Sequence, residues 1–163
     1  MTTEQMISSI GDPMVRELAM RGQTRAFPKN AIIINEGDRG DSLFVILAGK
    51  VKVYVSDDDG REMILDTYSA GDYVGEMSFD GRPRSASVMT LEPTTCAVLT
   101  RDELRAAIAQ NPDVAMTLIS TLIDRARIAT DNVKNLALMD VYGRVARLLF
   151  SLAKEDGGKL VLP

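Results

Sequence analysis

The sequence predicts a mostly β fold of the double-stranded β-helix, or jelly-roll, type, with a helical segment before it and a long helix after it. Short stretches of alternating hydrophobic and polar residues recur between residues 31 and 99. Glycines and aspartates separate these stretches at short intervals, as they do in β structure with tight turns. A long segment without Gly or Pro then follows Pro112.

The first element is helical. Between Thr3 and Arg21, hydrophobic residues recur at helical spacing, and the tripeptide 11–13, Gly-Asp-Pro, interrupts the pattern. The period then changes to two, which predicts strands over 31–34, 43–47, 51–55, 63–65, 86–91 and 95–99. Residues 57–60, Asp-Asp-Asp-Gly, predict a hairpin turn, since Asp and Gly tolerate the positive φ of tight turns. Many short strands at this spacing favour a jelly roll.

Helices are predicted again after the strands. A short one is expected over 101–104, and a long one over 112–139 with Pro112 in its first turn. Within the long helix an apolar seam advances by alternating steps of four and three residues, the spacing of a coiled coil. The seam predicts a homodimer, and the alternative is a single amphipathic helix lying on its own domain. The seam residues are Ala115, Ile119, Leu122, Ala126, Ala129, Val133 and Leu136.

Composition excludes several functions. The chain has no histidine and a single cysteine, Cys96, which removes most catalytic triads, imidazole metal sites and iron–sulfur clusters. We therefore predict no enzyme activity, no catalytic residues and no metal. With 163 residues, 45% of them hydrophobic, and a net charge of −4, the chain can bury a core but is poorly suited to grip nucleic acid by itself. A polar amino terminus and the lack of long apolar runs predict a cytoplasmic protein with no membrane segment.

Residues 75–86, Gly-Glu-Met-Ser-Phe-Asp-Gly-Arg-Pro-Arg-Ser-Ala, collect the groups that bind a phosphodiester with a neighbouring ribose. The guanidinium of Arg84 can engage two phosphate oxygens and stays charged at any working pH. Ser85 adds a hydroxyl donor. A carboxylate would repel the phosphate, so Glu76 is expected to accept hydrogen bonds from ribose hydroxyls instead. The alternative is an ordinary loop with a surface ion pair.

This segment resembles the phosphate-binding cassette of cyclic-nucleotide-binding domains, and the chain as a whole resembles the cAMP receptor protein family of bacterial regulators. The similarity includes residues 27–37, 42–54, the Pro-Arg-Ser-Ala run before the strand at 87–89, and 135–144. The resemblance implies a cyclic-nucleotide ligand, with cAMP expected first. It assigns the ribose-binding acid to Glu76, the phosphate-binding arginine to Arg84 and its supporting hydroxyl to Ser85. The complete predicted site is Gly75, Glu76, Met77, Ser78, Arg84, Ser85, Ala86 and Thr130.

Two departures from the family pattern keep other ligands open. The cassette is one or two residues shorter between Glu76 and Arg84 than in the best-known members. The helix positions that meet adenine in the family fall at Ala129 and Thr130, and only Thr130 carries a hydroxyl. A cyclic di-GMP sensor of the same fold and a ligand-independent dimerisation module therefore remain alternatives.

The predicted organisation has three parts. Residues 1–111 form the cyclic-nucleotide-binding β-roll, residues 112–139 the dimerisation helix, and residues 140–163 the start of a winged helix-turn-helix domain, with a helix at 141–154 and a strand at 159–162. The family's recognition helix would lie beyond Pro163, so DNA is expected to be contacted only through a C-terminal domain that this sequence does not contain. The predicted role is the sensing and dimerising part of a transcription regulator.

Overall fold

The computed structural model describes residues 1–138, 143, 145, 148–149, 154–156 and 159–161. It separates into two compact units, Met1–Thr117 and Leu118–Pro163. The first unit contains the β-roll and the second contains most of the long helix α4 (Asp113–Leu138). The finer division at residues 111 and 139 that the sequence predicts stays a prediction.

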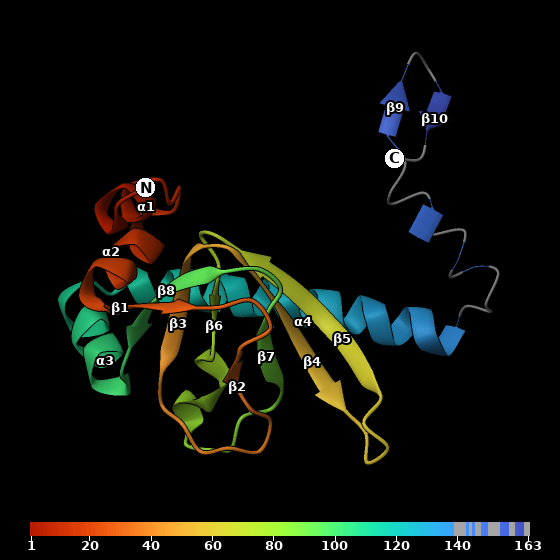
Figure 1. The fold of residues 1–163 in the computed structure, drawn as a ribbon, viewed down its shortest axis with the longest axis horizontal. Coiled ribbons are helices and arrows are strands. Elements are labelled where there is room, and N and C mark those ends of the chain that lie inside the picture. Colours follow the sequence, from red (N-terminus) through yellow and green to blue (C-terminus); the bar gives the residue numbers. More distant parts are fainter. Residues whose placement is uncertain (139–142, 144, 146–147, 150–153, 157–158, 162–163) are drawn as a thin grey trace. The chain divides into compact units, whose positions relative to one another are not determined.

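Two four-stranded antiparallel sheets form the roll (Figure 1). The first has the order β1 (Gln23–Phe27), β8 (Thr94–Leu99), β3 (Leu43–Ala48), β6 (Tyr73–Val74). The second has the order β2 (Ile32–Ile34), β7 (Ser87–Thr90), β4 (Lys50–Ser56), β5 (Glu62–Ser69). Strands adjacent in a sheet are mostly distant in sequence, as in a jelly roll. The predicted fold class, mostly β with helices, is confirmed.

The hydrophobic core lies between the two sheets. Strand β3 is buried along residues 43–47 without alternation, so both of its faces are covered. One face contributes to the cluster between the sheets, and helix α2 (Pro13–Arg21), which buries Val15, Leu18 and Ala19, packs beside β3 and β8. The core cluster consists of Ile34, Phe44, Ile46, Val51, Val74, Val88, Cys96 and Val98.

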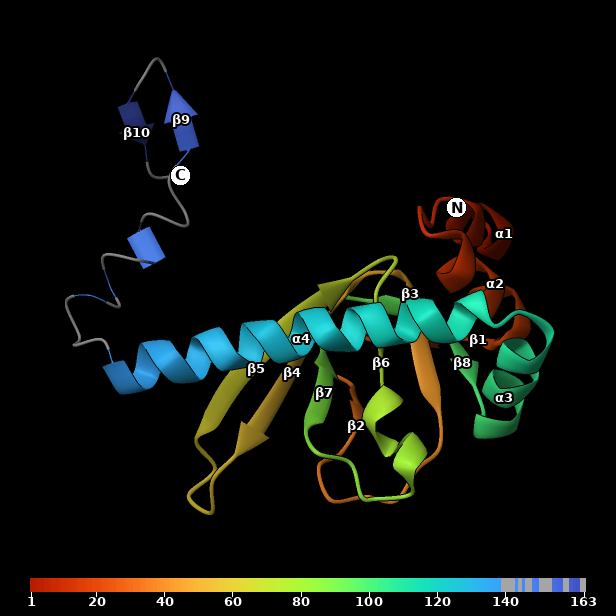
Figure 2. The same ribbon diagram turned by 180° about the vertical axis from the view of Figure 1, so that it is seen from behind.

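Three helices gather at one end of the roll, α1 (Thr3–Ser8), α2 and α3 (Arg101–Gln110) (Figures 1 and 2). The predicted break at 11–13 separates α1 from α2, because the Asp12 carboxylate caps α2 by accepting from the amides of Met14 and Val15. Glu17 of α2 accepts from the Asn111 amide at 2.9 Å and from Arg21 at 3.0 Å. These bonds lower the pKa of Glu17 and tie α2 to the turn that precedes α4.

Several predicted elements need correction. Strands β1 and β6 were not predicted, since β1 is an exposed polar edge strand and β6 has only two residues. Strand β5 is longer than the predicted 63–65, and α3 continues to Gln110 instead of ending at Leu104. Both extensions are largely exposed, so hydrophobic periodicity gave little signal for them.

The long helix is confirmed, since α4 covers nearly all of the predicted 112–139. The helix expected over 141–154 lies mostly outside the described residues. Of the five that are described within it, 143, 145, 148 and 149 are helical. Lys154 instead begins strand β9 (Lys154–Asp156), which pairs with β10 (Lys159–Val161). The strand predicted over 159–162 corresponds to β10, and the assignment of residues 140–163 to the start of a winged helix stays a prediction.

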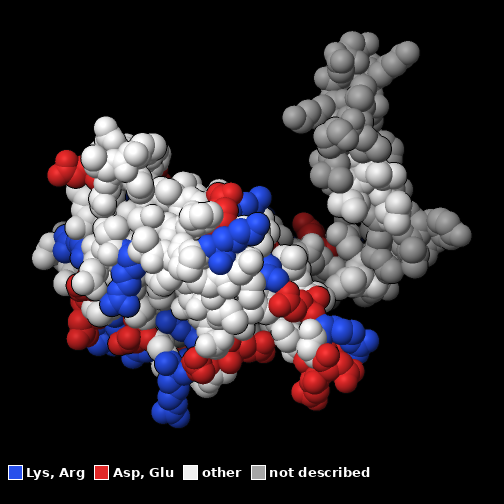
Figure 3. Space-filling model, in the orientation of Figure 1, with Lys and Arg blue, Asp and Glu red and all other residues white. Residues whose placement is uncertain are grey.

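The surface carries charges of both signs. On the face shown in Figure 3, basic and acidic side chains are interspersed over the roll, and no large area of one sign covers it. Such a face offers little of the continuous positive potential by which proteins hold nucleic acid. Within the described residues, no helix has the length and hydrophobicity needed to cross a bilayer.

Cys96 provides a test of the core. Its side chain is fully buried, and burial raises the pKa of the thiol to about 12. The reactive thiolate is therefore rare near neutral pH, and we expect iodoacetamide at pH 8 to modify the folded chain about three orders of magnitude more slowly than the denatured chain. Intact-mass spectrometry over time measures both rates. Similar rates in the two states would contradict the placement of Cys96 in the core.

Candidate functional site

The candidate site is built on the loop between β6 and β7. Gly75 follows β6 with φ of 95°, a left-handed conformation that favours glycine, and a short 3-10 helix, η1 (Glu76–Asp80), comes next. The chain turns again at Gly81 and enters β7 at Ser87. The loop therefore returns Arg84 towards the strand end that it left at Gly75. In both ribbon views it runs beside the loop between β2 and β3 (Figures 1 and 2).

Arg84 is the structural centre of this loop. It is only 9% exposed, and its guanidinium donates to two main-chain carbonyls: Nη1 to Gly75 O at 2.8 Å and Nη2 to Ser42 O at 2.9 Å. Its main chain is held as well, because its N–H donates to Asp38 O at 2.8 Å and its carbonyl accepts from Gly37 N at 2.9 Å. Three of these four hydrogen bonds, those to Gly37, Asp38 and Ser42, join Arg84 to the β2–β3 loop, and the fourth closes the β6–β7 loop on Gly75.

Two glycines make room for the guanidinium. A Cβ on Gly40 would lie 3.0 Å from Nη2 and 3.1 Å from Nε of Arg84. A Cβ on Gly75 would lie 2.9 Å from Nη1 and 2.6 Å from the carbonyl oxygen of Ser42. All four distances are shorter than ordinary contacts of a Cβ atom. The Arg84 guanidinium therefore occupies a slot in which a side chain at either glycine would require local rearrangement. The slot fixes where the positive charge sits.

Opposing effects act on the pKa of Arg84. Burial lowers the pKa of Arg84, and the carboxylates of Asp41 and Glu76 oppose that shift. An arginine in this setting remains protonated at physiological pH. A guanidinium has five N–H groups and the two carbonyls use two of them, so Arg84 has further donors for an anion.

The other predicted site residues of the loop differ in burial and in their contacts. Glu76 is half-buried and near enough to act electrostatically on Arg84. The Ser85 hydroxyl is exposed and donates to the Met77 sulfur at 3.5 Å, while Met77 itself is 61% exposed. Ala86 is half-buried at the entry to β7. Ser78 lies in η1, but its side chain is outside what the structure describes.

Thr130 belongs to the second unit. It lies on an exposed part of α4, where its hydroxyl donates to the Ala126 carbonyl at 2.9 Å. The loop 75–86, in contrast, belongs to the first unit. Whether Thr130 contributes to the site remains the prediction made from the family resemblance.

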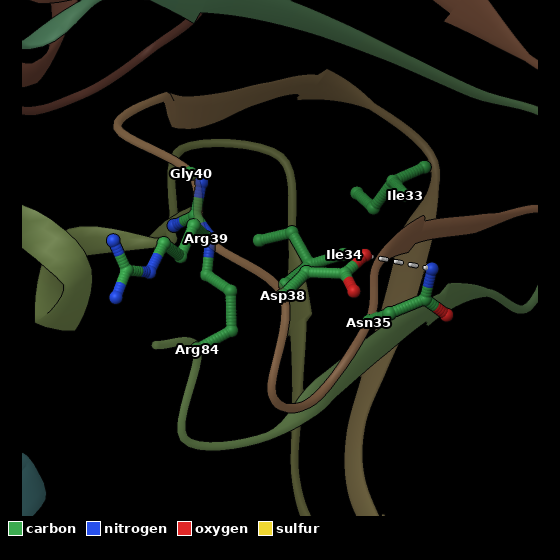
Figure 4. Close-up of a pocket in the computed structure, with 7 residues that line it drawn as sticks. All are labelled: Ile33, Ile34, Asn35, Asp38, Arg39, Gly40 and Arg84. Carbon is green, nitrogen blue, oxygen red and sulfur yellow. Dashed lines mark hydrogen bonds between the residues drawn. The ribbon is translucent and has the colours of Figure 1, made fainter. Parts of the chain in front are cut away.

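A shallow pocket of about 150 Å³ lies against Arg84 on the side of the β2–β3 loop (Figure 4). The Asp38 carboxylate turns towards Asn35, whose amide donates to it at 3.2 Å, and away from Arg84. Arg39 adds a second guanidinium beside the pocket. The sequence analysis did not identify Arg39 or Asp38 as site residues. They line the pocket only because the β2–β3 loop passes beside Arg84 in the folded chain. The pocket residues are Ile33, Ile34, Asn35, Asp38, Arg39, Gly40 and Arg84.

This arrangement is suited to binding an anion that also carries hydroxyl groups. A buried, fixed cation with spare donors can hold a phosphate, and a neighbouring carboxylate can accept from hydroxyl groups. Among the described residues there is no cluster of acidic or thiol side chains that could hold a metal ion.

Comparisons with known proteins agree with this chemistry. The family model described as "Cyclic nucleotide-binding domain" matches residues 24–111. The chain is 33% identical over 146 residues to the cAMP-activated global transcriptional regulator CRP of Salmonella typhimurium, covering 88% of this chain and 70% of that protein. It is 37% identical over 139 residues to a CRP-like cAMP-activated global transcriptional regulator of Mycobacterium tuberculosis, covering 82% of this chain and 62% of that protein.

Two solved structures of regulators have a fold similar to that of this chain. Catabolite activator protein of Thermus thermophilus has a TM-score of 0.70 and 31% identity, over 90% of this chain and 70% of that one. The c-di-GMP responsive global regulator CLP of Xanthomonas campestris has a TM-score of 0.75 and 26% identity, over 88% of this chain and 73% of that one.

The glycine slot predicts the effect of a methyl group at position 75. Gly75→Ala should lower the free energy of unfolding by about 1–3 kcal/mol, because alanine is strained at positive φ and its Cβ would press on Arg84 and on the Ser42 carbonyl. Urea denaturation followed by circular dichroism measures the change. Gly11→Ala is the matched control, since nothing lies within 4 Å of its added Cβ and its φ is not positive. Equal stability of the two variants would contradict the slot.

Proposed function

The chain belongs to the cyclic nucleotide-binding domain family and to the Crp/Fnr group of transcription regulators, and from this premise we propose that it senses cAMP through the loop 75–86. In this proposal Arg84 binds the cyclic phosphate, Ser85 adds a hydroxyl donor, and Glu76 accepts from the ribose hydroxyl. The main-chain amides around Gly75, Met77, Ser78 and Ala86 line the phosphate, and Thr130 contacts the base.

The observation that carries the proposal is the buried, pre-positioned guanidinium of Arg84. Its two bonds to main-chain carbonyls hold the side chain before any ligand arrives, so binding loses little side-chain entropy. The low-dielectric surroundings strengthen its attraction for a phosphate. The nearby Glu76 keeps the site from being simply cationic, which favours a ligand that presents a hydroxyl close to one negative charge.

The choice of cAMP follows the named relatives, two of which are called cAMP-activated. Cyclic di-GMP is the second candidate, and two observations favour it. The Xanthomonas regulator of similar fold is described as c-di-GMP responsive. In addition, Arg39 supplies a second cation that lines the same pocket as Arg84, which a ligand with two phosphates could use. A ligand-independent dimerisation module is the third candidate.

We also propose that the chain forms a parallel homodimer through α4. In heptad terms, Ile119, Ala126 and Val133 occupy a positions, while Leu122, Ala129 and Leu136 occupy d positions. β-Branched residues at a with leucine at d favour two parallel strands. The large apolar seam residues support a partner helix, because Ile119, Leu122, Val133 and Leu136 are 41% to 65% exposed.

In this proposal the ligand acts through the dimer. Ala129 lies on the seam and Thr130 follows it at an e position, so a base held by Thr130 would adjoin the partner helix. A ligand shifts a conformational equilibrium only by its differential affinity for the two states, and coupling of about 1–3 kcal/mol is typical. We propose that the whole regulator binds DNA. The DNA-binding part would correspond to the region of its relatives that this chain does not match. The role proposed is regulatory and not enzymatic, and it belongs to the cytoplasm.

Calorimetry tests the ligand and its arginine together. We expect wild-type chain to bind cAMP, and Arg84→Ala to bind it at least about 100-fold more weakly, since charge-assisted hydrogen bonds contribute about 1.5–3 kcal/mol each. Arg82→Ala is the control: Arg82 lies in the same loop, its side chain is 84% exposed, and it pairs only with Asp80 among the described residues. Circular dichroism checks that each variant is folded.

Other outcomes choose among the candidates. Tighter binding of cyclic di-GMP than of cAMP would favour the second candidate. Binding of neither ligand by wild type would favour the dimerisation module. A folded Arg84→Ala protein that binds as tightly as wild type would refute the assignment of the phosphate to Arg84.

Light scattering tests the dimer. Ala129→Glu would place two carboxylates against each other at a d position, so the mass should fall from twice 17.8 kDa to 17.8 kDa. Lys134→Glu is the control, because it adds the same carboxylate at a b position outside the seam. A dimer of unchanged stability in Ala129→Glu, or a monomeric wild type, would contradict the proposed interface.

A further inference from the structure

We propose that Met77 is a site of reversible oxidation that weakens binding at the loop 75–86, an inference that rests on the proposed function. The hydroxyl of Ser85, which the proposal assigns to the phosphate, is held in the structure by the Met77 sulfur at 3.5 Å. Met77 and Ser85 come from opposite ends of the same loop, one in η1 and one just before β7. The Met77 thioether therefore competes with the ligand for the Ser85 hydroxyl.

Met77 is accessible to solvent. The residue is 61% exposed, whereas Arg84 in the same loop is 9% exposed. A thioether is a weak hydrogen-bond acceptor, so Ser85 can leave it for a phosphate oxygen at little cost. In the reduced protein, Met77 thus keeps the hydroxyl at the mouth of the site without holding it strongly.

Oxidation would reverse that balance. A hydroperoxide transfers one oxygen atom to the sulfur: the O–O bond breaks, an S–O bond forms, the thioether is oxidised by two electrons to a sulfoxide, and the peroxide is reduced to water or an alcohol. The sulfoxide oxygen is a strong acceptor and carries partial negative charge. It should retain the Ser85 hydroxyl and repel a phosphate that approaches Arg84.

The experiment compares ligand affinity before and after oxidation. Wild-type chain is treated with hydrogen peroxide, the sulfoxide at each methionine is quantified by peptide mass spectrometry, and cAMP and cyclic di-GMP are titrated by calorimetry. We expect the Kd to rise about ten-fold in proportion to sulfoxide at Met77, the effect of losing one hydrogen bond to a charged phosphate. Methionine sulfoxide reductases should restore the affinity.

Two variants separate Met77 from the other methionines. Met77→Leu has no sulfur at this position, so its Kd, whatever its value, should be the same before and after peroxide. Met20→Leu removes a methionine of α2 that is 64% exposed, and it should still lose affinity on oxidation. If Met77→Leu binds too weakly to measure, the correlation with sulfoxide content and the reductase treatment of wild type decide the question.

The possible failures are distinguishable. Reduced wild type that binds neither ligand refutes the proposed function and this inference with it. Reduced wild type that binds, but keeps its affinity when Met77 is fully oxidised, refutes the inference and leaves the proposed function in place. A Met77 that peroxide does not modify, or an equal loss of affinity in oxidised Met77→Leu, also refutes it.

Discussion

The guanidinium of Arg84, held between the carbonyls of Gly75 and Ser42, is the contact on which the site depends. A buried arginine is unfavourable unless its donors are satisfied, and here two main-chain oxygens from different loops satisfy part of them. The same contact closes the β6–β7 loop against the β2–β3 loop. The same side chain, Arg84, thus both holds the two loops together and is proposed to bind the phosphate. Its remaining donors and its fixed charge are what a ligand would meet.

This constraint explains the residues around it. Gly40 and Gly75 are needed because the guanidinium passes close to their α-carbons, and Gly75 is needed again because its φ is positive. The carboxylates of Asp41 and Glu76 offset the effect of burial on Arg84. The roll supplies the rigid support: β3 is buried on both faces and carries Ser42 just before its first residue. A precise binding loop on a rigid sheet is the usual arrangement for a small-ligand site.

Ligand identity and assembly depend on weaker signals. The membership of the family is carried by motifs and by similarity over most of the chain, whereas the choice between cAMP and cyclic di-GMP turns on Ala129, Thr130 and Arg39. These residues come from two separate parts of the chain. The proposed homodimer depends on the exposed apolar residues of the α4 seam, which two copies of the chain could cover by pairing with each other.

The sequence by itself determined the fold class, the long helix and the loop that carries Arg84 and Glu76. Local patterns sufficed for these, because period, turn residues and the charge of a side chain are properties of neighbouring positions. Only the tertiary structure decided that Arg84 bonds to Ser42 and Gly75, that Gly40 lies against its guanidinium, that Arg39 lines the same pocket, and that Met77 accepts from Ser85. It also revealed β1 and the short β6. These features depend on strands and loops brought together by the roll, and no local periodicity encodes a contact between residues forty positions apart.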